Sequence, residues 1–382
     1  MSLTRRKTLA ILGGGTILAA TGAAYAVSRA PLTATEPWTL AGGYTDPRMR
    51  ALSYAVLAPN PHNRQPWIVD LDTPERATLY VDTNRLLPHT DPFSRQIIIG
   101  LGCFLELMAL AAAEEGIHVH FDLFPDGMNT DALDQRPVAV AHFEPGKGSA
   151  EPALFREVLN RRSLKEPFDM SQPVNNDTLA ALAAVVSKGS EVGSSNDAAL
   201  VAELRQLTAH AFEIEFETPR TYKESVDLFR IGRREIDANP DGIDLGGPMF
   251  ETLYMTGLFN RENALDTDGL GYRSGLDMVT STARTGMAYT WLTTSGNSRQ
   301  EQIMAGRDWV RLNLAATAMG LGVQPMSQAL QEFPEMDALY SQAHDLLAPE
   351  GGTVQMLGRL GYGPEVAQSP RWPLEAKLRK TG

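Results

Sequence analysis

Alternation between apolar and polar positions marks several short segments along the chain. Apolar residues recur at about every second position in residues 67–71, 78–82, 117–124 and 137–143. Because successive side chains of a strand point to opposite faces, each of these segments predicts a half-buried β-strand. A further strand is expected at residues 353–360.

Longer stretches between and after these strands have the character of helices. One helix is expected from about residue 45 to residue 58, because Asp46 can cap its first turn and Pro47 suits its first position. Two long helices are expected to begin at Arg95 and at Arg299, and others at residues 151–160, 177–188 and 196–217. Helices and strands in this order predict an α+β fold.

The two long helices carry an internal repeat. Placing each residue opposite the one 204 positions later pairs nine identical residues between positions 95 and 119, where about two would be expected from average composition. The pairs include Arg95-Gln96 with Arg299-Gln300 and Gly102 with Gly306. Both helices end at a glycine, Gly116 or Gly320, that suits a left-handed cap. Two unrelated helices rich in Ala and Leu would match at Leu and Ala but not at these residues.

We therefore expect a duplicated chain with two pseudo-repeated halves. The first half spans residues 27–144 and the second residues 145–382, each with a mixed or antiparallel sheet flanked by helices. Residues 144–150 are the best candidate for a linker. Residues 218–298 are rich in Gly, Pro and polar residues and have no partner in the first half, which predicts an inserted lid.

The first 26 residues resemble a targeting segment. Arg5 and Arg6 precede a short apolar run, and Ala24-Tyr25-Ala26 matches a cleavage site, so a twin-arginine signal and export to the periplasm are expected. A retained membrane anchor is the alternative, although three consecutive glycines weaken the run as a span. No other apolar run is expected to cross a membrane. Export of a folded chain suits a protein that loads a cofactor first.

Composition narrows the function. The chain has 382 residues and a formal charge of −12, and removing residues 1–26, which hold three basic and no acidic residues, leaves −15. A strongly acidic protein is a poor nucleic-acid binder, because phosphate tracking needs a basic surface. The one cysteine, Cys103, excludes an intrachain disulfide and a Cys-rich zinc site, and is expected in the core. His118 and His120 share one strand face, which could suit a metal. A partly exposed strand face is the favoured interpretation, because the sequence shows no partner carboxylate or cysteine for them.

Two segments carry candidate binding chemistry. In the first, Pro59 and Pro61 fix the backbone around Asn60, Asn63 and Gln65, so these amides suit the edge of a planar heterocycle. A proline-rich turn that caps a helix and starts a strand explains the same residues equally well.

The second segment is the basic cluster Arg161, Arg162, Ser163 and Lys165, which forms a compact candidate phosphate receptor. A solvated basic turn is the alternative, but such a cluster is conspicuous in an acidic protein. Arg371 adds a further basic residue near the C-terminus.

These segments together resemble the FMN-dependent nitroreductase superfamily, and in particular its tandem single-chain branch, the Acg-type flavin-binding proteins. The resemblance rests on residues 59–67, on the helices that begin at Arg95 and Arg299, on residues 161–168 and on residues 320–327. It extends over about residues 45–375 and is weakest in 218–298. It implies a nitroreductase-like fold in which the two halves pair as an intrachain pseudo-dimer, as two subunits do in ordinary nitroreductases. It also implies one FMN per chain, because the turn occurs only in the first half and the basic cluster only in the second.

The resemblance also implies roles for individual residues. Residues expected to hold the FMN phosphate and ribityl chain are Arg161, Arg162, Ser163, Lys165 and Arg371. Residues expected along the isoalloxazine are Pro59, Asn60, Pro61 and Asn63, supported by Gln65, while Pro325, Met326 and Ser327 are expected to bring backbone amides near N5. Many members have Glu and Gly where this chain has Ser327 and Gln328, which leaves the use of a nicotinamide donor open.

The function implied is a flavin oxidoreductase that transfers a hydride through N5 to a nitro, quinone or similar small acceptor. We predict no catalytic side chain and no metal ligand. A flavin-sequestering protein with little turnover and a cofactor-free periplasmic binding protein are the alternatives. We expect a monomer whose partners are a small acceptor and, if any, a redox protein.

Overall fold

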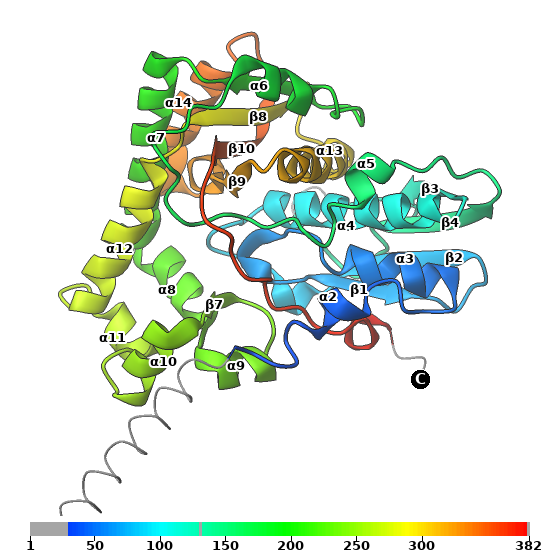
Figure 1. The fold of residues 1–382 in the computed structure, drawn as a ribbon, viewed down its shortest axis with the longest axis horizontal. Helices are drawn as coiled ribbons and strands as arrows, with labels where there is room; N and C mark the ends of the chain where they lie inside the picture. The colour runs from blue at the N-terminus through cyan, green and yellow to red at the C-terminus, as the bar shows by residue number, and fades with distance from the viewer. Residues whose placement is uncertain (1–29, 130–131, 380–382) are drawn as a thin grey trace, which may run out of the picture.

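The computed structural model describes residues 30–129 and 132–379. The expected twin-arginine segment therefore lies outside the described residues. The chain forms two similar halves and one large insertion (Figure 1). The long helices α4 (Arg95–Glu114) and α13 (Arg299–Ala318) lie side by side at the centre, and most of the remaining elements are arranged around them.

The first half has an antiparallel sheet of four strands. Its strands are β1 (Trp67–Asp70), β2 (Arg76–Val81), β3 (Ile117–Leu123) and β4 (Ala139–Pro145), in the order β1-β2-β4-β3. Helix α3 (Pro47–Ala55) precedes β1 and begins where the Asp46 side chain accepts the Arg48 N–H. All four expected strands of this half are present, with ends that differ by a few residues.

The second half repeats this arrangement. Its strands are β5 (Glu191–Ser195), β8 (Ala288–Thr294), β9 (Gly322–Pro325) and β10 (Thr353–Gly361), in the order β5-β8-β10-β9. In both sheets the order is first, second, fourth and third strand, and the long helix connects the second strand to the third. Helices α5 (Pro152–Phe155), α6 (Asn176–Ala183) and α14 (Asp337–Leu347) belong to this half, with α5 shorter than expected.

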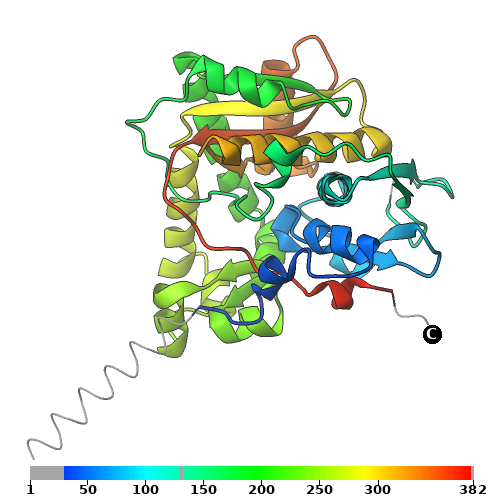
Figure 2. The same ribbon diagram turned by 45° about the vertical axis from the view of Figure 1, so that its right-hand side comes forward.

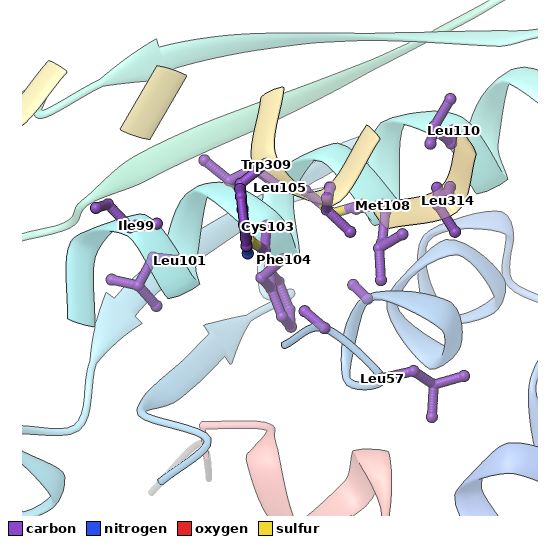
Figure 3. Close-up of a cluster of buried hydrophobic side chains, with 14 of the residues drawn as sticks. Leu57, Ile99, Leu101, Cys103, Phe104, Leu105, Met108, Leu110, Trp309 and Leu314 are labelled. Carbon is purple, nitrogen blue, oxygen red and sulfur yellow. The ribbon is translucent and has the colours of Figure 1, made fainter. Parts of the chain in front are cut away.

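The repeat is also visible where the two long helices cross. A Cβ atom on Gly102 would overlap the carbonyl oxygen of Ile303, and one on Gly306 would overlap that of Ile99. These contacts exchange under the 204-residue offset, so the two helices meet through the same residues from each side. Cys103 lies beside this crossing (Figure 3), buried, with its thiol 3.1 Å from the Gly306 carbonyl oxygen. The burial raises the pKa of this thiol to about 12, as suits a core residue.

The insertion leaves the second sheet between β5 and β8. It runs through α7 (Ala198–Glu217), α8 (Pro219–Asp227), α9 (Gly232–Ala238), α10 (Gly247–Met255), α11 (Arg261–Leu265) and α12 (Leu270–Ala283). A parallel pair, β6 (Phe229–Ile231) with β7 (Ile243–Leu245), lies within it. The first half has only a short turn at the equivalent position, residues 71–75. Residues 288–294 were expected in the insertion, but they form β8 inside the sheet, paired with both β5 and β10.

Both ends of the described chain lie against the first half and the insertion (Figure 2). The N-terminal segment enters beside α9 and continues into α2 (Glu36–Leu40), and the C-terminal tail ends in a short helix at Leu374–Lys377. Among the described helices, α4 is long and apolar enough to cross a membrane, which the sequence analysis overlooked. Because 89% of its apolar window is buried, packing within the fold explains that composition.

Candidate functional site

The turn at residues 59–65 is held in an unusual backbone conformation. His62, Asn63 and Gln65 have φ values of 46°, 49° and 48°, a left-handed region that residues other than glycine rarely occupy. Asn60 fixes the turn from inside, because its Oδ1 accepts the Gln65 N–H at 2.7 Å and its Nδ2 donates to the Ala58 carbonyl at 3.1 Å. Such a local cost is typical of functional segments that the surrounding structure keeps in place.

The other two amide side chains of the turn connect it to distant parts of the chain. Gln65 is fully buried, accepts the Trp372 N–H at 2.9 Å and donates to the Pro240 carbonyl in the insertion at 2.7 Å. Asn63 donates to the Pro370 carbonyl at 3.0 Å and accepts Arg371 Nη1 at 2.8 Å. These side chains bind protein groups, so a ring on this turn would meet mainly backbone and the faces of the prolines.

Three of the expected phosphate residues converge next to this turn. Arg161 and Arg371 are each 2% exposed, and both donate to the Leu57 carbonyl, at 3.3 and 3.1 Å. Arg371 also donates to the Ala58 carbonyl at 3.1 Å. The half-buried Arg162 donates to backbone carbonyls of its own segment and stacks on Trp38, with its guanidinium carbon 4.7 Å from the ring centroid. We call Arg161, Arg162 and Arg371 the arginine cluster.

The arginine cluster brings three positive charges close together. In the part of the chain that the structure describes, none of the three guanidinium groups forms an ion pair with a carboxylate. Burial lowers the pKa of Arg161 to about 10. Burial and repulsion from Arg161 and Arg162 lower the pKa of Arg371 to about 9, although the charge of Asp244 opposes this shift. Three buried N–H positions, Arg161 Nη1, Arg162 Nε and Arg371 Nε, also have no hydrogen-bond partner. Buried cations with unused donors fit an anion with several oxygens, such as a phosphate.

Ser163 and Lys165 lie at the outer side of this cluster. Ser163 is half-buried and Lys165 is exposed. The charge of Lys165 reaches the turn, since it adds to burial in lowering the pKa of His62 to about 4. His62, whose Nδ1 is buried without a partner, was not among the expected residues. The sequence showed only a histidine between Pro61 and Asn63, with no sign that its Nδ1 would be buried.

The third expected segment, residues 325–327, is brought to the cluster by the second sheet. The Leu164 N–H donates to the Val323 carbonyl of β9 at 3.0 Å. Pro325 has no N–H, and the Met326 N–H donates to Leu357 at 2.8 Å, so the Ser327 amide is the donor that this loop can offer. Backbone amides of all three residues were expected near the ring, so the expectation is corrected for Pro325 and Met326.

A fully buried arginine that the sequence analysis missed holds these loops together. Arg359 of β10 donates to Gln324 Oε1 at 2.6 Å and to the Glu166 carbonyl at 2.7 Å, and it stacks 4.0 Å from the Phe168 ring centroid. Burial lowers its pKa to about 10. An arginine within the apolar strand at residues 353–360 was the available signal.

The insertion contributes a buried acid next to Gln328 and Gln331, which follow the loop at residues 325–327. Glu215 of α7 is 5% exposed and accepts Gln331 Nε2 at 2.7 Å. Burial raises its pKa to about 7, although hydrogen bonds from Gln331 and Gln328 oppose the shift. A cavity of about 390 Å³ lies between α8 and the first half. Its lining residues, none of which was expected to bind cofactor, are Leu86, Leu87, Pro88, His89, Arg220, Lys223, Glu224, Asp227 and Leu228.

Sequence comparison finds relatives over most of the chain. A Mycobacterium tuberculosis protein provisionally named an NAD(P)H nitroreductase is 25% identical over 342 residues, which cover 85% of this chain and 91% of the relative. A second, named Acg and also provisionally an NAD(P)H nitroreductase, is 30% identical over 128 residues, 32% of this chain and 36% of its own length. No model of a known protein family matches the chain.

Comparison with solved structures finds more distant matches. The FMN-dependent nitroreductase NfnB of Mycobacterium smegmatis, solved with NADPH, matches 60% of this chain and 98% of its own at 18% identity and a TM-score of 0.38. A protein of Anabaena variabilis, provisionally named a nitroreductase, matches 81% of this chain and 82% of its own at 14% identity and a TM-score of 0.38.

Proposed function

We propose that this chain is a flavin oxidoreductase of the nitroreductase type that binds one FMN between its two halves. The named relatives support the class, since the similarity to the nitroreductase-named protein of M. tuberculosis spans 85% of the chain. The observation that carries the proposal for this chain is the arginine cluster.

The arginine cluster fits the phosphate of FMN. A flavin phosphate carries up to two negative charges and three terminal oxygens, and the cluster offers three unused N–H positions on groups whose burial disfavours their own charge. The cluster lies against Leu57 and Ala58, which directly precede the turn at residues 59–65. A phosphate bound there would place the rest of the cofactor beside that turn.

The same contacts support one site per chain. Arg161 and Arg371 come from the second half, and the carbonyls that they bind belong to the first half. The first half has no counterpart of the arginine cluster, and the second has no counterpart of the proline-asparagine turn. Each half therefore supplies one part of a shared site.

When bound, FMN would supply the two-electron chemistry, taking up a hydride and passing it to a nitro, quinone or similar acceptor. The chain's own residues would bind and orient it. Pro59, Asn60 and Pro61 would form a rigid wall, since Asn60 is fixed by two hydrogen bonds. The Ser327 amide would donate to the ring edge, with Arg359 keeping its loop in place through Gln324.

The absorption spectrum and flavin stoichiometry of the purified full chain test the proposal. We expect about one FMN per chain. Arg371→Ala should weaken FMN binding by 10- to 150-fold, because a charge-assisted hydrogen bond contributes roughly 1.5–3 kcal/mol. The affinity for riboflavin, which has no phosphate, should fall much less, by the effect of losing the Arg371 contacts to the turn alone. Arg156→Ala removes an exposed arginine paired with Glu157 and is the matched control. A colourless chain that binds no added FMN would overturn the proposal, and unchanged FMN affinity in Arg371→Ala would overturn the phosphate assignment.

A flavin-sequestering role is the second candidate, because the insertion covers the turn. The Gly242 N–H donates to the Asn63 carbonyl at 3.2 Å, and Gln65 binds Pro240 in the same segment. Steady reduction of a nitroaromatic or a quinone with an artificial donor supports the oxidoreductase. A bound flavin that resists reduction by dithionite supports sequestration.

We also propose that the protein is exported by the twin-arginine route. Fractionation of cells that express the full chain and the variant with Arg5 and Arg6 both changed to Lys tests this location. The proposal requires the periplasmic pool of the protein to disappear in the variant.

A further inference from the structure

The first described segment of the chain, residues 30–41, lies across the arginine cluster. Figures 1 and 2 show it running from the insertion at α9 toward the first half, close to the C-terminal tail. It contains α2 and is not part of either sheet. We call residues 30–41 the N-terminal strap.

One aspartate of the insertion fixes the beginning of the strap. The carboxylate of Asp237, on α9, accepts the backbone N–H groups of Leu32, Thr33 and Ala34 at 2.9, 3.0 and 3.2 Å. These three consecutive donors share one acceptor group, so the strap depends on a single side chain at this point. A hydrogen bond from the Arg371 N–H to the Ala34 carbonyl, at 2.7 Å, follows directly.

Trp38 connects the strap to the arginine cluster. Its ring is 2% exposed and lies 4.7 Å from the guanidinium carbon of Arg162 and 5.6 Å from that of Arg371. Its Nε1 donates to the Ser369 carbonyl at 2.8 Å. Cation–π contacts of this kind order both guanidinium planes and remove them from water. The unused Nε positions of Arg162 and Arg371 are therefore buried next to the strap.

We propose that the N-terminal strap closes the phosphate end of the cofactor site, with Trp38 as a positioning residue of that site and Asp237 as its latch. FMN enters or leaves only after residues 30–41 detach from α9. This inference rests on the proposed function and adds two residues to the site that the sequence analysis did not include. It follows from the burial of the free donors, because an anion cannot reach them past a tryptophan that is almost fully covered.

Asp237→Ala tests the latch. Removing the shared acceptor should raise the detached fraction of the strap in the free and in the FMN-bound protein alike. We therefore expect association and dissociation of FMN to become at least tenfold faster, with the equilibrium Kd changed less than threefold. Stopped-flow flavin fluorescence measures both rates, and hydrogen exchange of residues 30–41 reports on the strap directly.

Trp38→Ala distinguishes closure of the site by the N-terminal strap from positioning of Arg162 and Arg371 by the tryptophan ring. It removes the stacking surface of two arginines, so both rates should rise and the Kd for FMN should also increase, whereas binding of riboflavin should change much less. Asp197→Ala is the matched control, because Asp197 also accepts backbone N–H groups, at the start of α7, and makes no contact with the cluster. Its FMN rates should equal those of the wild type.

The rates of FMN binding and the hydrogen exchange of residues 30–41 together decide whether the strap controls access. Unchanged association and dissociation rates in Asp237→Ala, with faster hydrogen exchange in residues 30–41, would show that the strap opens without controlling access and would overturn this inference. The inference is also overturned if only the Kd rises while association is unaffected. A wild-type chain that binds no FMN contradicts the proposed function instead, so the two failures can be told apart.

Discussion

The crossing of α4 and α13 gives a direct stability test of the duplicated architecture. Gly102 and Gly306 allow the two helices to approach so closely that each position faces a carbonyl of the other helix, that of Ile303 or Ile99. Gly102→Ala places a methyl group against backbone atoms, which cannot rotate away as a side chain can. The helices must therefore move apart or shift along each other.

The magnitude follows from two opposing effects. Overpacking a tight core contact costs about 1–3 kcal/mol, and more where backbone has to move. Replacing a helical glycine by alanine contributes about 1 kcal/mol in the other direction. Since a carbonyl is the obstacle here, we expect Gly102→Ala to lower the free energy of unfolding by about 2 kcal/mol. At about 2–4 °C per kcal/mol for domains of 150–250 residues, its Tm should fall by roughly 4–8 °C. Gly306→Ala should have a similar effect.

Gly275 of α12 provides the control. A Cβ atom there would meet only a Phe216 ring carbon at 3.7 Å, an ordinary contact. Gly275→Ala should therefore raise the free energy of unfolding by up to about 1 kcal/mol. Urea and thermal unfolding of the three variants measure the difference in sign. If Gly102→Ala were as stable as Gly275→Ala, the close crossing, and the reciprocal contacts that indicate duplication, would be wrong.

Two further predictions concern buried charged groups. Burial raises the pKa of Glu215 from 4.5 to about 7, so the folded chain binds its proton more tightly, and this group makes stability fall as the pH rises from about 4.5 to 7. Glu215→Gln should remove that loss, worth about 3 kcal/mol at 1.36 kcal/mol per pKa unit. In urea unfolding, the free energy of unfolding of the variant relative to the wild type should therefore increase between pH 5 and pH 8. A difference independent of pH would contradict the assignment. Arg359→Ala leaves the partly buried acceptors at Gln324 and Glu166 without this donor and should cost about 2 kcal/mol in the same assay. A loss below 1 kcal/mol would argue against its proposed anchoring role.

The local features of the fold could be predicted from the sequence because they depend on neighbouring residues. Alternation identified the strands of the first half, and Asp46 with Pro47 identified the start of α3. The repeat was visible because the helix crossing needs the same residues twice. Strand β8 was missed because its sequence, AYTWLTT, does not alternate regularly and because the Gly- and Pro-rich insertion before it was extended too far along the chain.

The parts of the site that depend on distant contacts could not be predicted. Trp38 gave no functional signal, because its partners Arg162 and Arg371 are far away in the sequence and meet it only after folding. The same holds for Asp237, which accepts from residues about 200 positions earlier. Arg161 was expected in a phosphate receptor from the basic cluster itself, and Arg371 was added by the resemblance, but only the structure brings both to the Leu57 carbonyl.

Residues that are repeated in both halves and segments that occur in one half have different roles. The duplicated Arg95 and Arg299 both reach across the centre: Arg95 donates to the Gln355 and Leu330 carbonyls, and Arg299 donates to that of Phe93. Each arginine joins one half to the other, and a pseudo-dimer needs such a contact once from each half. This explains why the same residue type occurs at both positions. A ligand site shared by two halves is needed only once, so the arginine cluster and the turn at residues 59–65 were each free to be lost from one half. Symmetry at the helix crossing with asymmetry at the site is therefore what a single shared ligand would produce, whereas two equivalent sites would have kept both segments in both halves.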